Sequence, residues 1–358
     1  MTPLNAPARW FAAVTTRPFA LHGTAALRIG LGLLYLAFLL RELPARHHLW
    51  GPHAAWSPSI DRGYADATPW WGWTKHWYTL AATGNSAWFE ISYALAVLVT
   101  VAFTAGYRTR LTSALFMVTV TAVHGRNIFV VDPSDVLLML LSVYLVFTAC
   151  GRLWSVDAFL ATRHAVSRPA RALSWPGGHR CPPARTGELA EVRRRLVVLV
   201  HNCAVLVIGF QMCLLYGASG MYKVQGKTWQ DGTAMYYVLH IQGFRPWPGL
   251  SDWMAGHSLA MAVIAYFTVF VQIGFVFTVF HRKLKYVFLA GLVAMHLGIA
   301  VVLGLPWFSA VVVTGDAVFL PESFWQAVGR AASRARPGAR RRTRVPAVVP
   351  ARDADPVV

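Results

Sequence analysis

The sequence is poor in charged residues, and acidic residues are the scarcer kind. Charged residues make up 13% of the 358 residues, against roughly 25% in an average soluble domain. Apolar residues reach 56%, and the mean hydropathy is +0.45. So few charges cannot cover a surface that faces water. The composition therefore excludes an ordinary soluble protein and indicates a chain that contacts the lipid bilayer.

Because acidic residues are few, the chain is strongly basic. It has 33 lysines and arginines against 15 aspartates and glutamates, a net charge of +18. In a soluble protein this balance would indicate nucleic-acid binding. Here the basic residues lie in short segments between apolar runs and in the C-terminal tail, as in the cytoplasmic loops of membrane proteins. We therefore expect the bilayer, and no nucleic acid, as a partner.

Cysteine is also scarce. The four cysteines form no C-x-x-C pair, and no Cys/His cluster has zinc-ligand spacing. The sequence lacks a G-x-G-x-x-G dinucleotide fingerprint as well. We expect no disulfide framework and no metal site.

Long apolar runs are what the sequence has instead. A membrane-spanning helix needs about 20 predominantly apolar residues. The pattern predicts an all-α fold, a polytopic transmembrane helix bundle of about eight spans. The last predicted span is short enough to be re-entrant or tilted. The predicted spans are 25–41, 87–106, 110–125, 133–150, 196–218, 257–281, 285–304 and 307–321.

The positions of the basic residues predict the orientation. They cluster between spans two and three, in the loop 151–195, between spans six and seven, and in the tail. All four regions lie on the cytoplasmic side only if the number of spans is even and both termini are cytoplasmic. We thus predict a multi-pass cell-membrane protein with a membrane domain over 1–322 and a disordered basic cytoplasmic tail over 323–358. The aromatic-rich loops 42–86 and 219–256 are then extracytoplasmic.

Ionisable residues inside membrane spans are costly and often functional. Each also has a structural interpretation: Glu90 and Asp316 could pair with a basic residue on a neighbouring helix, His201 could be interfacial, and His296 could form a helix–helix hydrogen bond. The candidates are Glu90, His124, Asp135, His201, Lys223, Lys227, His296 and Asp316.

Lys223 is the strongest candidate. It follows the small residues 217–220 at the predicted outer end of the fifth span, where a helix or ligand can approach the backbone closely. If the segment is helical, Lys227 lies on the same face. A neighbouring like charge and partial burial both favour a neutral lysine, which can act as a base or nucleophile. The structural alternative is a lysine that reaches to the lipid interface.

Four stretches carry a resemblance to a known family. They are ALRIGLGLLYL with Arg28, HHLWGPHAAWSP, LWSVDAFL (153–160) and SGMYKVQGKTWQDGTAMYY (219–237). In this order they resemble the membrane domain shared by vitamin K-dependent gamma-carboxylases and the bacterial HTTM proteins, over roughly residues 20–322.

The resemblance implies roles for several residues. Lys223 falls on the family's proposed base, with Gly220 before it and Trp229 and Gly232 after it. The spacing to Trp229 is one residue longer than the family pattern, so Lys227 stays an alternative base. Asp135 stands about where the family has an assisting histidine, and His296 matches a histidine of a late span.

The resemblance also implies a reaction. A lysine deprotonates a hydroquinone, the anion reacts with dioxygen, and an epoxide forms, with no metal or flavin cofactor. The large extracytoplasmic domain of the glutamate carboxylases has no counterpart in this sequence, so we expect no glutamate carboxylation. We expect a small aromatic quinol as substrate, bound by residues of the outer segments: Tyr222, Trp229, Tyr236, Tyr237 and His124.

Two other interpretations stay open. Residues 223–237 also resemble the membrane partner of the sporulation-delaying peptide system, whose relatives act in maturation or export of a secreted peptide toxin. In that case the substrate is a short peptide and Lys223 positions it. A membrane scaffold without enzymatic activity is the third possibility.

Overall fold

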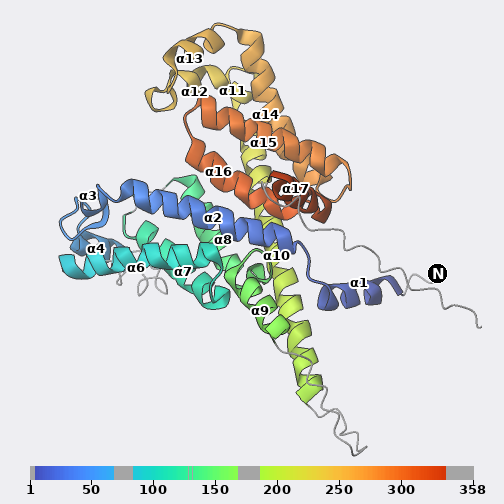
Figure 1. Ribbon diagram of the computed structural model, residues 1–358. Coiled ribbons are helices and arrows are strands. Elements are labelled where there is room, and N and C mark those ends of the chain that lie inside the picture. The colour runs from blue at the N-terminus through green and yellow to red at the C-terminus, as the bar shows by residue number, and fades with distance from the viewer. Residues whose placement is uncertain (1–4, 68–83, 128, 131, 168–185, 336–358) are drawn as a thin grey trace, which may run out of the picture. The chain divides into compact units, whose positions relative to one another are not determined.

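The structure is a computed structural model that describes residues 5–67, 84–127, 129–130, 132–167 and 186–335 (Figure 1). Every element in these ranges is a helix, which confirms the all-α prediction. The α-helices are α1 (Asn5–Thr16), α2 (Leu21–Glu42), α3 (Arg46–Trp50), α4 (Pro58–Ala67), α6 (Ser86–Ala105), α7 (Thr109–Gly125), α8 (Pro133–Val146), α9 (Val156–Ser167), α10 (Thr186–Gln225), α11 (Lys227–Gln230), α12 (Ala234–His240), α13 (Pro248–Ala255), α14 (Ser258–Thr278), α15 (Leu284–Val302), α16 (Pro306–Gly315) and α17 (Glu322–Ala335).

Five of these helices are long and apolar enough to cross a membrane. They are α2, α6, α14, α15 and the Glu188–Gln225 part of α10. Each is apolar around most of its circumference, as expected for a helix that faces lipid on one side and protein on the other. The chain thus has the helices of a membrane protein, and five of the eight predicted spans are found at spanning length.

The other three predicted spans are shorter helices. α7 has 17 residues, α8 has 14, and α16 has 10 followed by a 3-10 turn, η4, at Asp316–Phe319. A 14-residue helix is about 21 Å long, less than the roughly 30 Å of hydrocarbon in a bilayer. α8 ends at Val146 rather than at the predicted residue 150. Eight crossings and cytoplasmic termini therefore stay predictions.

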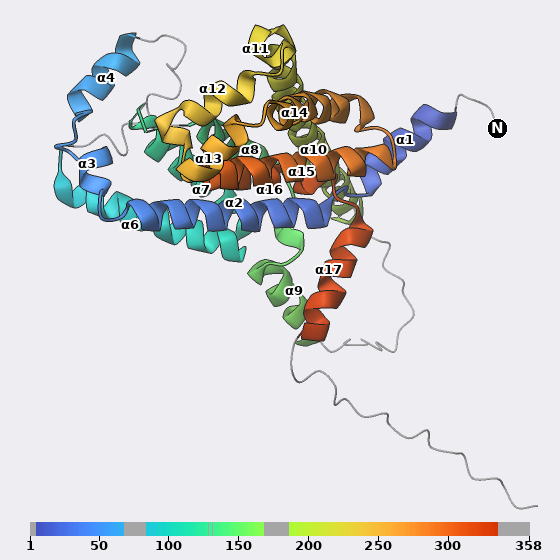
Figure 2. The same cartoon turned by 90° about the horizontal axis from the view of Figure 1, so that it is seen from above.

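The long helices form two groups that α16 joins. α2 packs on α6, α6 on α7, and α7 on α8, while α10 packs on α14, α14 on α15, and α15 on α16. α16 also packs on α2 and α8. Figures 1 and 2 show α10 as the longest helix, with α11, α12 and α13 gathered near one end of α14 and α15.

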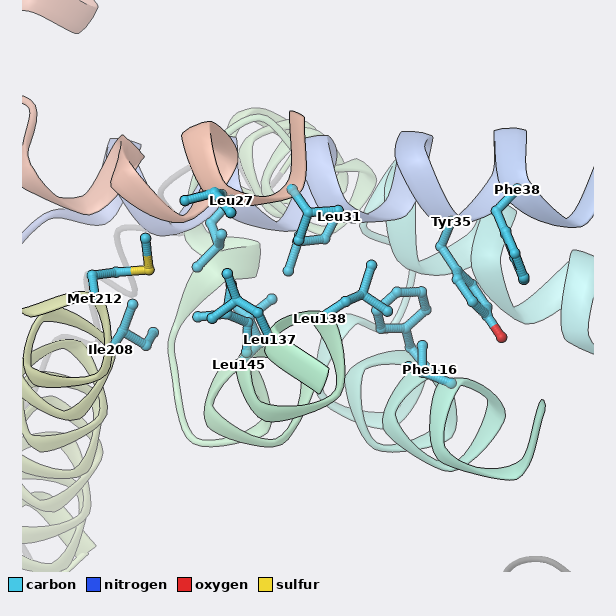
Figure 3. Close-up of a cluster of buried hydrophobic side chains, with 14 of the residues drawn as sticks. Leu27, Leu31, Tyr35, Phe38, Phe116, Leu137, Leu138, Leu145, Ile208 and Met212 are labelled. Carbon is cyan, nitrogen blue, oxygen red and sulfur yellow. The ribbon is translucent and has the colours of Figure 1, made fainter. Parts of the chain in front are cut away.

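The core lies where α2, α7, α8 and α10 meet (Figure 3). Leu31 and Tyr35 of α2, Leu138 of α8 and Met212 of α10 have no exposed side-chain surface. Lipid tails are as apolar as leucine, so shape-matched van der Waals packing, rather than removal from water, holds such a core together.

Arg28 joins three segments at one end of the bundle. Its buried guanidinium donates hydrogen bonds to the carbonyls of Phe103 (2.9 Å) and Thr104 (2.7 Å) at the end of α6, and of Trp154 (2.6 Å). Gly106 ends α6 with φ +74°, and a Cβ there would collide with the guanidinium. The ALRIG and LWSVD stretches, far apart in the sequence, therefore meet in a structural joint.

Asp157 makes a second joint at the same end. Its carboxylate accepts hydrogen bonds from the backbone N–H groups of Arg108 (2.8 Å) and Thr109 (2.7 Å) and from the Thr109 hydroxyl (2.7 Å). Partial burial raises the pKa of Asp157, but the hydrogen bonds from Thr109 and Arg108 outweigh it and hold that pKa below its usual value. Asp157 thus caps the N-terminus of α7 from a distance.

The HHLWGPHAAW stretch is held at the other end of the bundle. Arg126 donates to the carbonyls of Trp56 (2.8 Å) and Gly51 (3.4 Å), and the Asn127 amide donates to Leu49 (2.8 Å). Glu90 of α6 pairs with Arg46 and His47 of α3. These contacts give Glu90 the structural role that the sequence left open.

Several predicted loops contain helices. The 219–256 segment begins with the last residues of α10 and continues with α11, α12 and α13. The 151–195 segment contains α9 and the start of α10. Residues 168–185, which include Cys181, lie outside the described residues. The chain divides into two compact units, Met1–Leu320 and Pro321–Val358. In the second unit, Glu322–Ala335 form α17. This part of the tail was predicted to be disordered. Phe324 and Val328 recur here at the spacing of a helix, which favours a helical segment.

Candidate functional site

A cavity of about 450 Å³ lies at the end of α10, between α10, α12, α14, α15 and the start of α16. Its wall is mostly apolar, with side chains such as Met254, Phe267, Met295 and Phe308. Only a few polar side chains line it: Ser219, Lys223, Thr268, Gln272 and His296. An apolar cavity with a few polar groups is the usual form of a small-molecule site.

Lys223 enters this cavity from the last turn of α10. Its ammonium is half-buried, donates a 2.6 Å hydrogen bond to the Ser219 hydroxyl, and lies 5.2 Å from the centre of the Trp229 ring. A cation over an indole face is stabilised by the ring quadrupole. A Cβ at Gly220 would collide with the Ile273 side chain of α14. The small residue therefore lets α14 approach α10 closely enough to close one wall of the cavity.

His296 of α15 faces the same cavity. The ring is buried, and neither ring nitrogen has a hydrogen-bond partner within the described residues. Phe308 and Tyr216 lie beside it, with ring centres 5.7 Å and 6.1 Å away. Lys223 and His296 thus line one cavity from two different helices.

A buried pair lies behind His296. The Tyr216 hydroxyl donates a 2.7 Å hydrogen bond to Asp316 Oδ2, and both side chains are almost fully buried. The sequence left open a basic partner for Asp316; in the structure a tyrosine of α10 takes that place. Sequence reasoning also missed Gln272 of α14, a cavity residue whose Oε1 atom has no partner among the described residues. The feature of the sequence that could have identified Gln272 is the position of a glutamine in the middle of an apolar run.

The predicted residues Asp135 and His124 lie in a separate cluster. His124 Nδ1 is 3.7 Å from Asp135 Oδ2, and the His124 ring packs on Phe38 with centres 5.2 Å apart. Asp135 also accepts the backbone N–H of Asp132 in the capping box of α8. Neither residue lines the cavity of Lys223. The structure therefore does not bring Asp135 and His124 to the cavity of Lys223.

The two lysines do not share a helix face. α10 ends at Gln225, Gly226 has an extended backbone (ψ 123°), and Lys227 starts the short α11 as an exposed residue. A residue with extended backbone cannot continue the α-helix, so the chain changes direction at Gly226. The like charge at Lys227 is thus not aligned with Lys223 by helix geometry, and burial beside Trp229 is what distinguishes Lys223.

Of the predicted aromatic residues, one lines the cavity and three do not. Trp229 lines the cavity, whereas Tyr222, Tyr236 and Tyr237 are 77%, 43% and 58% exposed and lie outside it. Tyr236 packs against Tyr237 and His240 instead. His201 is structural, as the sequence allowed: its ring bonds the backbone of Ala149 and Phe19.

Comparison with models of known protein families, with curated proteins and with solved structures finds no match. The fold and the site define a class in coarse terms. The described part of the chain is all-helical, has five helices long and apolar enough to cross a membrane, and holds an apolar cavity with a lysine and a histidine on its wall.

Proposed function

We propose that the protein is a membrane oxygenase that deprotonates a small hydroquinone with Lys223 and converts it to an epoxide with dioxygen. One observation supports this most: the lysine that matches the family's base opens into an apolar cavity together with Trp229 and His296.

The cavity suits a single aromatic ring. Its volume of about 450 Å³ lies within the 300–1,000 Å³ typical of ligand sites. The Trp229 face can stack on a quinol ring. The apolar wall can also keep water from the phenolate while it meets oxygen.

The reaction balances without another reductant. A hydroquinone hydroxyl has a pKa near that of tyrosine, about 10, and neutral Lys223 accepts its proton. The anion forms a carbon–oxygen bond to dioxygen, the O–O bond breaks as the epoxide closes, and the released hydroxide takes the proton back from Lys223. That hydroxide carries the second hydroxyl proton, which moves to the peroxide before the O–O bond breaks, so the proton from Lys223 turns it into water. Hydroquinone plus dioxygen thus gives quinone epoxide plus water.

His296 has a role in this scheme as a hydrogen-bonding group. Both of its ring nitrogens lack partners within the described residues, so either can accept or donate a hydrogen bond at the second quinol oxygen. Such a contact would fix the ring relative to Lys223.

Membranes that contain the protein, supplied with a panel of hydroquinones under oxygen, test the proposal. Wild type is expected to form epoxide, detected by mass spectrometry as a product heavier than the quinone by one oxygen. Lys223→Met is expected to lower the rate at least about 100-fold, as loss of a general base does. Lys227→Met is the matched control and should retain activity. Full activity of Lys223→Met, or loss of activity in Lys227→Met alone, would contradict the assignment.

A peptide-maturation role is the second candidate. Tyr222, Tyr237 and Lys227 are each exposed and do not line the cavity, and exposed tyrosines are common in peptide and protein contacts. This role predicts that deleting the gene abolishes the activity of a secreted peptide encoded beside it. It also predicts that the hydroquinone panel gives no epoxide.

A further inference from the structure

A second cavity lies far from the first. It has a volume of about 680 Å³ and lies where α6 leads into α7, where α8 ends, and along α10. Val197 on its wall is 26 residues before Lys223 on the same helix, so the two sites are about 39 Å apart along α10. This is the end of the bundle that the distribution of basic residues predicts to be cytoplasmic.

Three arginines from two segments line this cavity. Arg108 and Arg110 come from the start of α7, and Arg152 comes from the turn after α8. All three are exposed, and none of them contacts a carboxylate within the described part of the chain. Among the described residues that line the cavity, Asp157 alone is acidic, and its hydrogen bonds go to the start of α7.

The backbone at Arg108 fixes one of these charges in place. Arg108 has φ +44°, in the left-handed region that non-glycine residues rarely adopt. The carboxylate of Asp157 holds its backbone N–H in this conformation. The positive charge is thus presented by a constrained turn rather than by a free loop.

The wall also has large apolar side chains that are exposed. Leu111 of α7, Phe147 after α8 and Leu196 of α10 are 54%, 56% and 57% exposed. The cavity therefore combines a cluster of guanidinium groups with an apolar surface on membrane-spanning helices. A small inorganic anion would contact only the guanidinium groups, whereas an anionic phospholipid would contact the guanidinium groups and the apolar surface.

We propose that this cavity binds an anionic phospholipid. The phosphate of the headgroup is held by Arg108, Arg110 and Arg152, because guanidinium groups match phosphate oxygens in charge and geometry. The acyl chains lie along the apolar surfaces of α7 and α10. Basic pockets between helices at the cytoplasmic side are where such headgroups bind. The proposal does not depend on the reaction at Lys223.

The test uses the purified full chain in nanodiscs and measures thermal unfolding and bound lipid by native mass spectrometry. Compared with phosphatidylcholine, phosphatidylglycerol is expected to raise the midpoint temperature of unfolding by several degrees. It is also expected to remain bound to the protein in the mass spectrum. The triple variant Arg108→Ala/Arg110→Ala/Arg152→Ala should lose both effects. The matched control, Arg282→Ala/Lys283→Ala/Lys285→Ala in the α14–α15 turn, removes the same charge outside the cavity and should keep both.

Other outcomes would overturn the proposal. Equal losses in the two triple variants would show non-specific attraction of lipid to a basic surface. An equal rise in midpoint with inorganic phosphate alone would show that the apolar wall has no part. If the triple variant does not fold, Arg152→Gln serves instead and should weaken phosphatidylglycerol binding about fivefold, the effect of one charge near a headgroup. Unchanged binding in that variant would contradict the proposal.

Discussion

At the scale of single residues, some buried polar groups of this bundle are paired between segments far apart in the sequence. Tyr216 and Asp316 are the closest buried pair behind the Lys223 cavity, at 2.7 Å. Asp316 Oδ1 has no hydrogen-bond partner within the described residues. The tyrosine hydroxyl is therefore the main group that compensates for burying this carboxyl.

Removing that hydroxyl should be costly. Tyr216→Phe leaves Asp316 buried without its donor, and we expect a loss of about 1–3 kcal/mol in the free energy of unfolding. The double variant Tyr216→Phe/Asp316→Leu removes both polar groups and should recover most of that loss. Thermal unfolding in detergent measures both. If the double variant loses as much stability as Tyr216→Phe and Asp316→Leu lose together, or more, the pair has no favourable coupling.

Asp157 predicts a pH dependence. Its pKa is lowered in the folded chain, chiefly by hydrogen bonds from Thr109 and Arg108 that outweigh the opposing effect of burial. A lowered folded pKa stabilises the protein at pH values above the unfolded pKa of about 3.9, and this contribution is lost as the pH falls below it. Unfolding midpoints of wild type and Asp157→Asn should therefore differ near neutral pH and converge in acid. A constant difference would contradict the assignment.

The sequence identified Lys223, Trp229 and His296, which the structure brings to one cavity, but it could not separate them from Asp135 or Tyr237. Residue type and position in an apolar run predict that a side chain is unusual. They do not show which face of a helix it occupies. Asp135 lies next to His124 rather than Lys223 because α7 and α8 pack together, and only the tertiary arrangement shows that.

At the scale of elements, helix contacts depend on a few small residues. The apolar runs predicted α2, α6, α14 and α15 to within a few residues. They did not predict where α10 ends, because Gly226 interrupts a segment whose composition stays compatible with a helix. They did predict a short last helix, and α16 with η4 covers Pro306–Phe319.

Gly274 allows α14 and α15 to pack closely. A Cβ at this position would collide with the Phe288 ring of α15. Gly274→Ala is expected to destabilise the protein by about 1–3 kcal/mol, as overpacking does. Gly209→Ala in α10 is the control, because its Cβ would meet only the Phe319 ring at 3.6 Å, and alanine is the better helix former. Thermal unfolding of both variants checks the prediction, and equal midpoints would contradict it.

At the scale of the whole molecule, the basic loops predict which helix ends lie on each side of the membrane. Tyr237 in α12 is exposed, as is Arg163 in α9. The basic loops predict that Tyr237 faces outward and Arg163 faces the cytoplasm.

Cysteine labelling tests this arrangement. In a chain whose four native cysteines are replaced by alanine, Tyr237→Cys should react with a membrane-impermeant maleimide in intact cells. Arg163→Cys should react only after the cells are opened. Labelling of both, or the reverse order, would show that the predicted orientation is wrong.

The hydrogen bonds of Arg28 bear on the order in which the protein is made. Its acceptors Phe103, Thr104 and Trp154 follow it by 75, 76 and 126 residues. During synthesis, α2 thus enters the membrane with a guanidinium that has none of its three acceptors, and such a charge is costly away from water. The first span becomes fully anchored only after the turn that follows α8 has left the ribosome. All three acceptors of Arg28 are therefore present once residue 154 has been made, before α10 is synthesised.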